Sequence, residues 1–142
     1  MSGLSAFLAE NALPAENVKF VASKRFLDDD GKPVEWEIRA LTSAEDEALR
    51  KACYKRVPIP GKRGRYVQET DNDAYLGKMA AACTVFPKLD DSVLQDSYHV
   101  MGAEALLKAM LTNGEYAAYL EKVQEVCGYD ADMQEQVDEA KN

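Results

Sequence analysis

The sequence predicts an α+β domain that is mostly α-helical, with an N-terminal helix, one β-hairpin and then a bundle of four or five helices. Three observations support this fold class. Two runs near the start alternate apolar and polar residues, apolar residues recur at helical spacing beyond residue 42, and 46% of the 142 residues are hydrophobic. We expect one globular domain at 1–128. An acidic tail at 129–142 is expected to be a frayed helix or disordered.

The first predicted elements are a short helix and the hairpin. Residues 2–9 place three apolar side chains on one helical face, and we expect this helix to dock on the body or on a partner. The hairpin strands are predicted at 18–23 and 34–39. Between them, Asp30 and Gly31 provide the residue types that adopt the positive φ angles of a tight turn.

Two capping boxes mark where helices begin. Thr42 with Glu45, and Thr112 with Glu115, have the spacing at which each side chain satisfies a backbone donor of the other residue. The last helix is expected to end at Gly128, which suits a left-handed C-cap. Three further helices are predicted between the two capping boxes, and they begin at Thr70 or Asp71, after Ser92, and at Ala103.

Helical spacing also predicts which side chains are buried. The helix that begins at residue 42 should bury Ala44, Ala48, Leu49, Ala52 and Cys53. The helix that begins near residue 71 should bury a stripe that runs up to Pro87, namely Tyr75, Leu76, Met79, Ala80, Cys83 and Phe86. Prolines and glycines make 57–64 a predicted loop.

No residue pattern points to catalysis, a metal or a cofactor. His99 is the single histidine, and no nucleophile motif accompanies it. Together with Cys53, Cys83 and Cys127 it has the composition of a zinc site, but the cysteines lack the close pair spacing of structural sites. We interpret the three cysteines as small core residues, since cysteine is among the most buried residue types.

The charge distribution limits the classes of partner. A net charge of −8 makes nucleic acid an unlikely main partner, because phosphate binding needs a cationic face. The chain begins without a basic leader and has no apolar run long enough for a bilayer, so we expect no membrane association and a cytosolic protein.

One segment departs from the acidic background. Five positive charges fall within eleven residues, with an aromatic ring beside them. The residues are Lys55, Arg56, Lys62, Arg63, Arg65 and the neighbouring Tyr66. The rest of the chain therefore carries a net charge of −13. Such a loop on an acidic body suits contact with an acidic protein or with another copy of the chain. A solvated loop is the alternative, and RNA binding ranks third. The candidate contact residues are Lys62, Arg63, Arg65 and Tyr66.

The chain resembles the XkdN-like tail assembly chaperones of tailed phages and prophages of Gram-positive bacteria. The resemblance covers nearly the whole chain, from about residue 4 to 128. No single piece is a catalytic signature, and the specificity comes from an ordered set of segments: 21–26, 31–38, 55–62, 74–78, 100–107 and 114–116.

The resemblance implies a non-enzymatic protein that binds the tape measure protein, assists tail tube subunits, works in the bacterial host cytoplasm and is absent from the mature virion. A helical domain with an apolar groove suits such a client. Candidate groove residues are Met79, Met101, Leu107, Met110 and Leu111, for which plain core packing is the alternative. A homo-oligomer is a further expectation. The competing function is an acidic phage regulatory or inhibitory protein that mimics nucleic acid.

Overall fold

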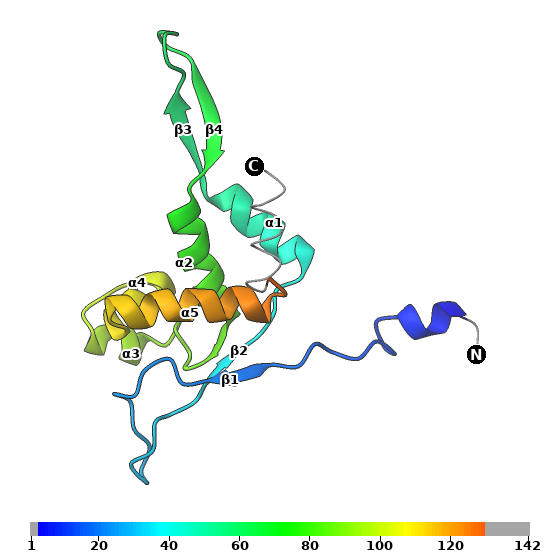
Figure 1. Cartoon of the computed structure of the whole chain (residues 1–142), viewed down its shortest axis with the longest axis vertical. Coiled ribbons are helices and arrows are strands. Elements are labelled where there is room, and N and C mark those ends of the chain that lie inside the picture. The colour runs from blue at the N-terminus through cyan, green and yellow to red at the C-terminus, as the bar shows by residue number, and fades with distance from the viewer. Residues whose placement is uncertain (1–2, 130–142) are drawn as a thin grey trace.

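The computed structural model describes residues 3–129 of the chain. Within them the fold is α+β, as predicted, with five α-helices and two small antiparallel sheets (Figure 1). A 3-10 helix, η1, comes first. The elements in chain order are η1 Gly3–Phe7, β1 Val18–Phe20, β2 Trp36–Ile38, α1 Ser43–Ala52, β3 Tyr54–Pro58, β4 Tyr66–Thr70, α2 Asn72–Cys83, β5 Thr84–Phe86, α3 Ser92–Ser97, α4 Ala103–Met110 and α5 Asn113–Val126.

The predicted hairpin is present, and a third strand joins it. β1 pairs antiparallel with β2, with Phe20 opposite Trp36, and β5 adds to the other edge of β2. The sequence prediction that Phe86 continues the buried stripe of the preceding helix is wrong. The helix α2 ends at Cys83, and Phe86 lies on β5 with 50% of its surface exposed. Sheet pairing with β2 therefore overrides the helical spacing of this segment.

A second hairpin encloses the predicted loop, and residues 59–64 of that loop form part of its connection. β3 and β4 pair over their whole length, and Val57 and Pro58, which were assigned to the loop, are strand residues. The connection at the tip is closed by a hydrogen bond from the Ile59 N–H to the Arg65 carbonyl at 3.0 Å. Gly61 and Gly64 adopt φ angles of 79° and 74° there, which favour glycine. The structure therefore has two hairpins, where one was predicted.

The predicted helix caps are confirmed. In both capping boxes the threonine hydroxyl accepts from the glutamate N–H, at 3.2 Å for Thr42 and 3.3 Å for Thr112. The Glu45 and Glu115 carboxylates accept from the threonine N–H in return, at 3.0 and 2.9 Å. Asp71, the second of two predicted choices, caps α2. Gly128 follows α5 with a φ of 100°.

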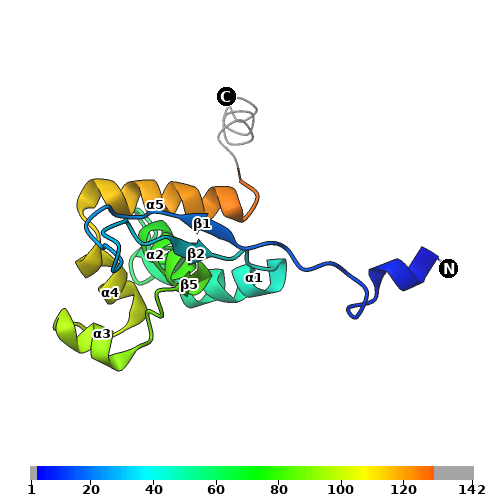
Figure 2. The same cartoon turned by 90° about the horizontal axis from the view of Figure 1, so that it is seen from below.

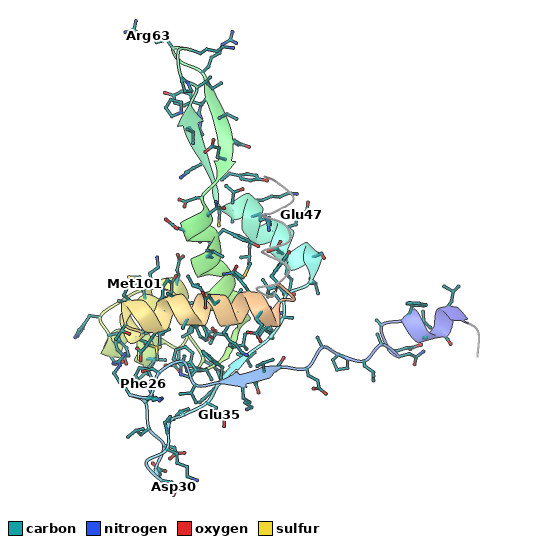
Figure 3. The ribbon with its side chains drawn as sticks, in the orientation of Figure 1. Phe26, Asp30, Glu35, Glu47, Arg63 and Met101 are labelled. Atoms are coloured by element: carbon teal, nitrogen blue, oxygen red, sulfur yellow. The ribbon has the colours of Figure 1, made fainter. Side chains whose placement is uncertain are left out.

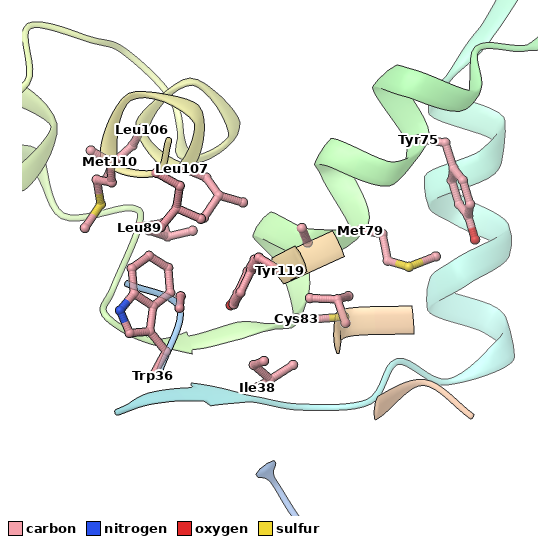
Figure 4. Packing of buried hydrophobic residues seen from close by; sticks show 14 of the residues in the cluster. Trp36, Ile38, Tyr75, Met79, Cys83, Leu89, Leu106, Leu107, Met110 and Tyr119 are labelled. Carbon is pink, nitrogen blue, oxygen red and sulfur yellow. The ribbon is translucent and has the colours of Figure 1, made fainter. Parts of the chain in front are cut away.

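The core forms where α2 and α5 cover the three-stranded sheet, and α2 also packs against α1 and α4 (Figures 1 and 4). Trp36 and Tyr119 meet edge to face at its centre, with ring centroids 5.2 Å apart. The Tyr119 hydroxyl lies 2.6 Å from the Thr84 hydroxyl, which donates to the Ala80 carbonyl. The largest fully buried side chains are Trp36, Tyr119, Ile38, Leu106, Leu107, Val123 and Cys83.

The N-terminal segment leaves this core and extends away from the body (Figures 1 and 2). It contains a 3-10 turn, and Leu4 and Phe7 are largely exposed. The expectation that it docks on its own body is therefore wrong for the described structure. Docking on a partner stays a prediction. The acidic tail predicted at 129–142 lies, beyond Tyr129, outside the described residues.

Candidate functional site

A protruding basic hairpin carries the predicted cationic cluster. We call β3, β4 and their connection, residues 54–70, the basic hairpin; it projects from the body, with Arg63 at its tip (Figure 3). All five predicted cations are exposed, and none forms an ion pair within residues 3–129. The sequence prediction of clustered positive charge is thus matched by a projecting element that presents it to solvent.

The basic hairpin also offers apolar surface. Tyr54, Tyr66 and Val67 are each about half exposed, and the Arg56 guanidinium lies over the Tyr66 ring at 4.7 Å from its centroid. Nearly every residue of both strands is exposed, because none of the other elements within residues 3–129 covers either face. Isolated two-stranded hairpins are marginally stable in water. This surface therefore combines positive charge with aromatic side chains and is available to a partner.

The other predicted contact residues do not form one surface. Leu107, Met110 and Leu111 are buried in the core, as is Met79, so the core alternative accounts for their apolar character. Met101 is separate from them: it precedes α4 and is 91% exposed. Of the candidate groove residues, Met101 alone lies on the surface of the described chain, because it belongs to the turn that precedes α4.

An apolar groove lies between the end of α1, the middle of α2 and the start of α4, with a volume of about 640 Å³. Small side chains form much of its wall, and Met101 contributes one edge. Its lining residues are Leu49, Ala52, Lys78, Ala81, Met101, Gly102, Ala103, Glu104, Ala105 and Lys108. No pattern in the sequence predicts this groove, because the helices that form it come together only in the fold.

The groove explains a wrong prediction for α1. Ala44, Ala48, Leu49 and Ala52 were expected in the core. Leu49 is partly buried and packs against it, but the three alanines are exposed, and α1 has no fully buried residue. The apolar side of α1 therefore faces the groove in part. Instead, polar contacts help to hold α1 on α2, since the Tyr75 hydroxyl donates to Asp46 and the Arg50 guanidinium lies 4.7 Å from the Tyr75 ring centroid.

The three cysteines and the histidine, all within the described residues, do not come together as one metal site. Cys53 and Cys83 are buried as predicted, whereas Cys127 is partly exposed, with its Sγ 3.7 Å from the Cys83 Sγ. The hydrogen bond between these thiols, together with burial, raises the pKa of Cys83, and the same bond lowers the pKa of Cys127. His99 is exposed in the turn after α3, with φ at 57°.

Within residues 3–129, no three histidine, cysteine or acidic side chains are grouped so as to hold a metal ion. None of the helices in that range is both long and apolar enough to cross a membrane. The described chain presents three surfaces to its surroundings: the basic hairpin, the apolar groove and the extended N-terminal segment.

Comparison with known proteins gives a consistent result. The model of the phage XkdN-like tail assembly chaperone family matches residues 4–141. YqbN of Bacillus subtilis is 33% identical over 142 residues, covering 98% of this chain and 93% of the relative. The XkdN protein of the phage-like element PBSX, from the same bacterium, is 29% identical over 140 residues with the same coverage.

A solved structure supports the same assignment. The crystal structure of YqbN aligns with a TM-score of 0.75 and 27% identity, over 92% of this chain and 99% of the YqbN chain. The family match, the sequence relatives and the shared fold each span nearly the whole molecule. This chain therefore belongs to the phage XkdN-like tail assembly chaperone family.

Proposed function

We propose that this chain is a non-enzymatic chaperone that binds the tape measure protein and assists assembly of the tail tube around it. It acts in the cytoplasm of the bacterial host and does not remain in the mature virion. The observation that carries the proposal is the match of the tail assembly chaperone family model over residues 4–141.

The basic hairpin is the surface that we assign to the client. A long amphipathic helix exposes an apolar stripe flanked by charged side chains, and it aggregates when the stripe is left uncovered. Tyr54, Tyr66 and Val67 offer apolar area, and the cations at the tip offer partners for carboxylates. Binding would also cover a hairpin that the body leaves unsupported.

Co-expression with the tape measure protein of the same phage tests the function. The tagged wild-type chain should keep that protein in the soluble fraction and copurify with it. If the tape measure protein stays in the pellet and none is recovered with the tagged chain, the proposal is wrong.

A charge-reversed chain tests the assigned surface. Changing Lys62, Arg63 and Arg65 to Glu should abolish copurification, because the tip would then repel acidic groups. The matched control changes three exposed lysines outside the basic hairpin to Glu, namely Lys24, Lys32 and Lys88. The control alters net charge equally and should keep the client bound. Equal loss in both variants would remove the basic hairpin as the specific contact.

A further inference from the structure

The N-terminal arm, defined here as residues 3–17, is folded on itself, and at its root the Asn17 side-chain amide donates to the Glu37 carboxylate of β2 at 3.4 Å. After η1 the chain turns, and this turn is held by the Asn11 N–H and the Ala12 N–H, which both donate to the Leu8 carbonyl at 2.9 and 2.8 Å. The Asn11 side-chain amide donates to the Ser5 carbonyl at 2.7 Å. The arm is therefore a preformed structural unit at the end of an extended segment, rather than a chain without local structure.

This unit leaves its apolar side chains in water. Leu4, Phe7 and Leu13 are 78%, 83% and 93% exposed, and Leu8 is about half exposed. Leu4, Phe7 and Leu8 have the spacing that gathers side chains on one side of a helical turn. Contiguous apolar surface of this kind on a projecting element marks a contact site.

The apolar groove has the properties needed to receive the arm. Its walls contain the small side chains of Ala52, Ala81 and Ala105, so an incoming aromatic ring meets little obstruction, and the flexible Met101 side chain stands 91% exposed at its edge. Both surfaces are apolar and exposed. Burying each against the other removes them from water together.

Charge on the two surfaces is complementary. The arm contains Glu10 and Glu16 and no lysine or arginine. The charged residues that line the groove are Lys78, Lys108 and Glu104. Glu104 forms an ion pair with Lys108, in which Oε1 and Nζ are 3.5 Å apart. The groove therefore has more basic than acidic side chains, although the chain as a whole is acidic.

The arm and the groove of one chain face different directions. Figure 3 shows Met101 on one side of the body and the arm leaving on the other side, and Figure 2 confirms that the arm points away from α4. Among the described residues, one molecule thus presents an arm and a groove that its own arm does not occupy. Such a pair generates a head-to-tail contact between copies, which repeats unless it closes into a ring.

We propose that the N-terminal arm of one copy docks in the apolar groove of a second copy. The contact buries Phe7 and Leu4 against α1, α2 and α4 of the neighbour, and it brings the acidic arm to Lys78 and Lys108. This interface is separate from the basic hairpin, so self-association and client binding use different surfaces of the chain.

Sedimentation velocity of the full chain over a range of concentrations tests the proposal. The wild type should form dimers and larger species as concentration rises. Phe7→Asp, on the arm, and Ala52→Glu, in the groove, should each weaken association at least tenfold. Both positions are exposed, and circular dichroism checks that the variants are folded. The control is Val93→Asp on α3, which changes a 76% exposed apolar residue in the same way and should associate like the wild type.

Mixing the two variants distinguishes this contact from a symmetric one. Phe7→Asp retains an intact groove and Ala52→Glu retains an intact arm, so the mixture should form a 1:1 heterodimer that does not grow further. A mixture that stays monomeric contradicts the head-to-tail contact. A wild type that stays monomeric at every concentration contradicts it as well.

Two further results would assign the surfaces differently. If the wild type is monomeric and Ala52→Glu makes its arm more sensitive to proteolysis, the arm fills its own groove and the proposal is wrong. If Phe7→Asp associates normally but no longer captures the tape measure protein, the arm binds the client instead. Copurification of the client with the monomeric variants keeps a failure of this proposal separate from a failure of the proposed function.

Discussion

Glu115 shows how a single carboxylate joins distant parts of the chain. It accepts from the Thr112 N–H in the capping box, and from the Arg25 guanidinium at 3.1 Å. The same guanidinium donates to the Met110 carbonyl at 2.5 Å, so the connection between β1 and β2 is tied to the junction of α4 and α5. The backbone hydrogen bond of Thr112 is the largest cause that lowers the pKa of Glu115 to about 2.

The first prediction concerns the pH dependence of stability. Because the pKa of Glu115 falls from 4.5 to about 2 on folding, its stabilising contribution is complete above pH 4.5 and is lost as pH falls toward 2. The free energy of unfolding in urea should therefore decrease across this window. Glu115→Gln should reduce the slope, because one carboxyl with a shifted pKa is gone.

A part of the slope should persist in that variant, since the pKa of Glu45 is also lowered to about 2, mainly by its hydrogen bond with Arg39. The control is Glu121→Gln, an exposed position on the same helix. The same pH dependence in Glu115→Gln and Glu121→Gln would contradict a stabilising role for the Glu115 carboxylate.

At the residue scale the sequence predicts local contacts and misses remote ones. Thr112 and Glu115 are three positions apart, so their capping box follows from spacing and helix geometry alone. Arg25 is 90 positions from Glu115, and no local pattern links the two. The buried places of Leu107 and Met110 likewise depend on the helices that surround them, and this is why apolar character alone suggested a contact role.

At the element scale, the close packing of α2 against α4 and α5 depends on Gly77. A Cβ added at this position would lie 2.5 Å from Oε1 of Glu104 and 3.1 Å from the hydroxyl oxygen of Tyr116. Both of these atoms are at the ends of side chains, which move more readily than backbone. The contact therefore tolerates one added methyl group but not a large side chain.

The second prediction follows from this geometry. Gly77→Ala should change the free energy of unfolding by less than about 1 kcal/mol, because the gain in helix propensity offsets the displacement of Glu104. Gly77→Leu should destabilise the chain by about 1–3 kcal/mol through overpacking. Urea unfolding of both variants measures the difference. Equal stability of the two would mean that α2 is not packed closely at Gly77.

Elements defined by local signals were predicted, and elements defined by pairing were not. The hairpin of β1 and β2 was expected from its alternation and its Asp-Gly turn. β5 was missed because its partner β2 lies far back in the sequence and Phe86 happens to continue a helical spacing. β3 and β4 were missed because Pro58 lies within one strand, and proline in a strand is tolerated only at an edge such as this two-stranded sheet provides.

At the scale of the whole molecule, an acidic body carries one basic projection. Helices α1, α2 and α4 create the groove together. The N-terminal arm leaves the body on the side away from Met101 and α4 (Figures 1 and 3). The sequence predicted the charge of the projection but not its shape. It did not predict the groove, since no spacing within one helix reports how three helices meet.

The third prediction concerns the salt dependence of client binding. Cations at the tip of the basic hairpin are exposed, so their attraction to acidic groups is screened as ionic strength rises. Binding of the tape measure protein should weaken markedly between low salt and about 0.5 M NaCl. Copurification across a salt series measures this effect. Binding that does not change with salt would mean that apolar contacts alone hold the client.

The fourth prediction tests the chaperone function itself, by light scattering from a purified tape measure protein that is diluted out of denaturant. Added wild-type chain should suppress the scattering in proportion to its amount, until the client is fully covered. The chain changed to Glu at Lys62, Arg63 and Arg65 should suppress it far less at equal concentration. Scattering that is the same with and without the wild-type chain would contradict the proposal that this protein keeps the tape measure protein soluble.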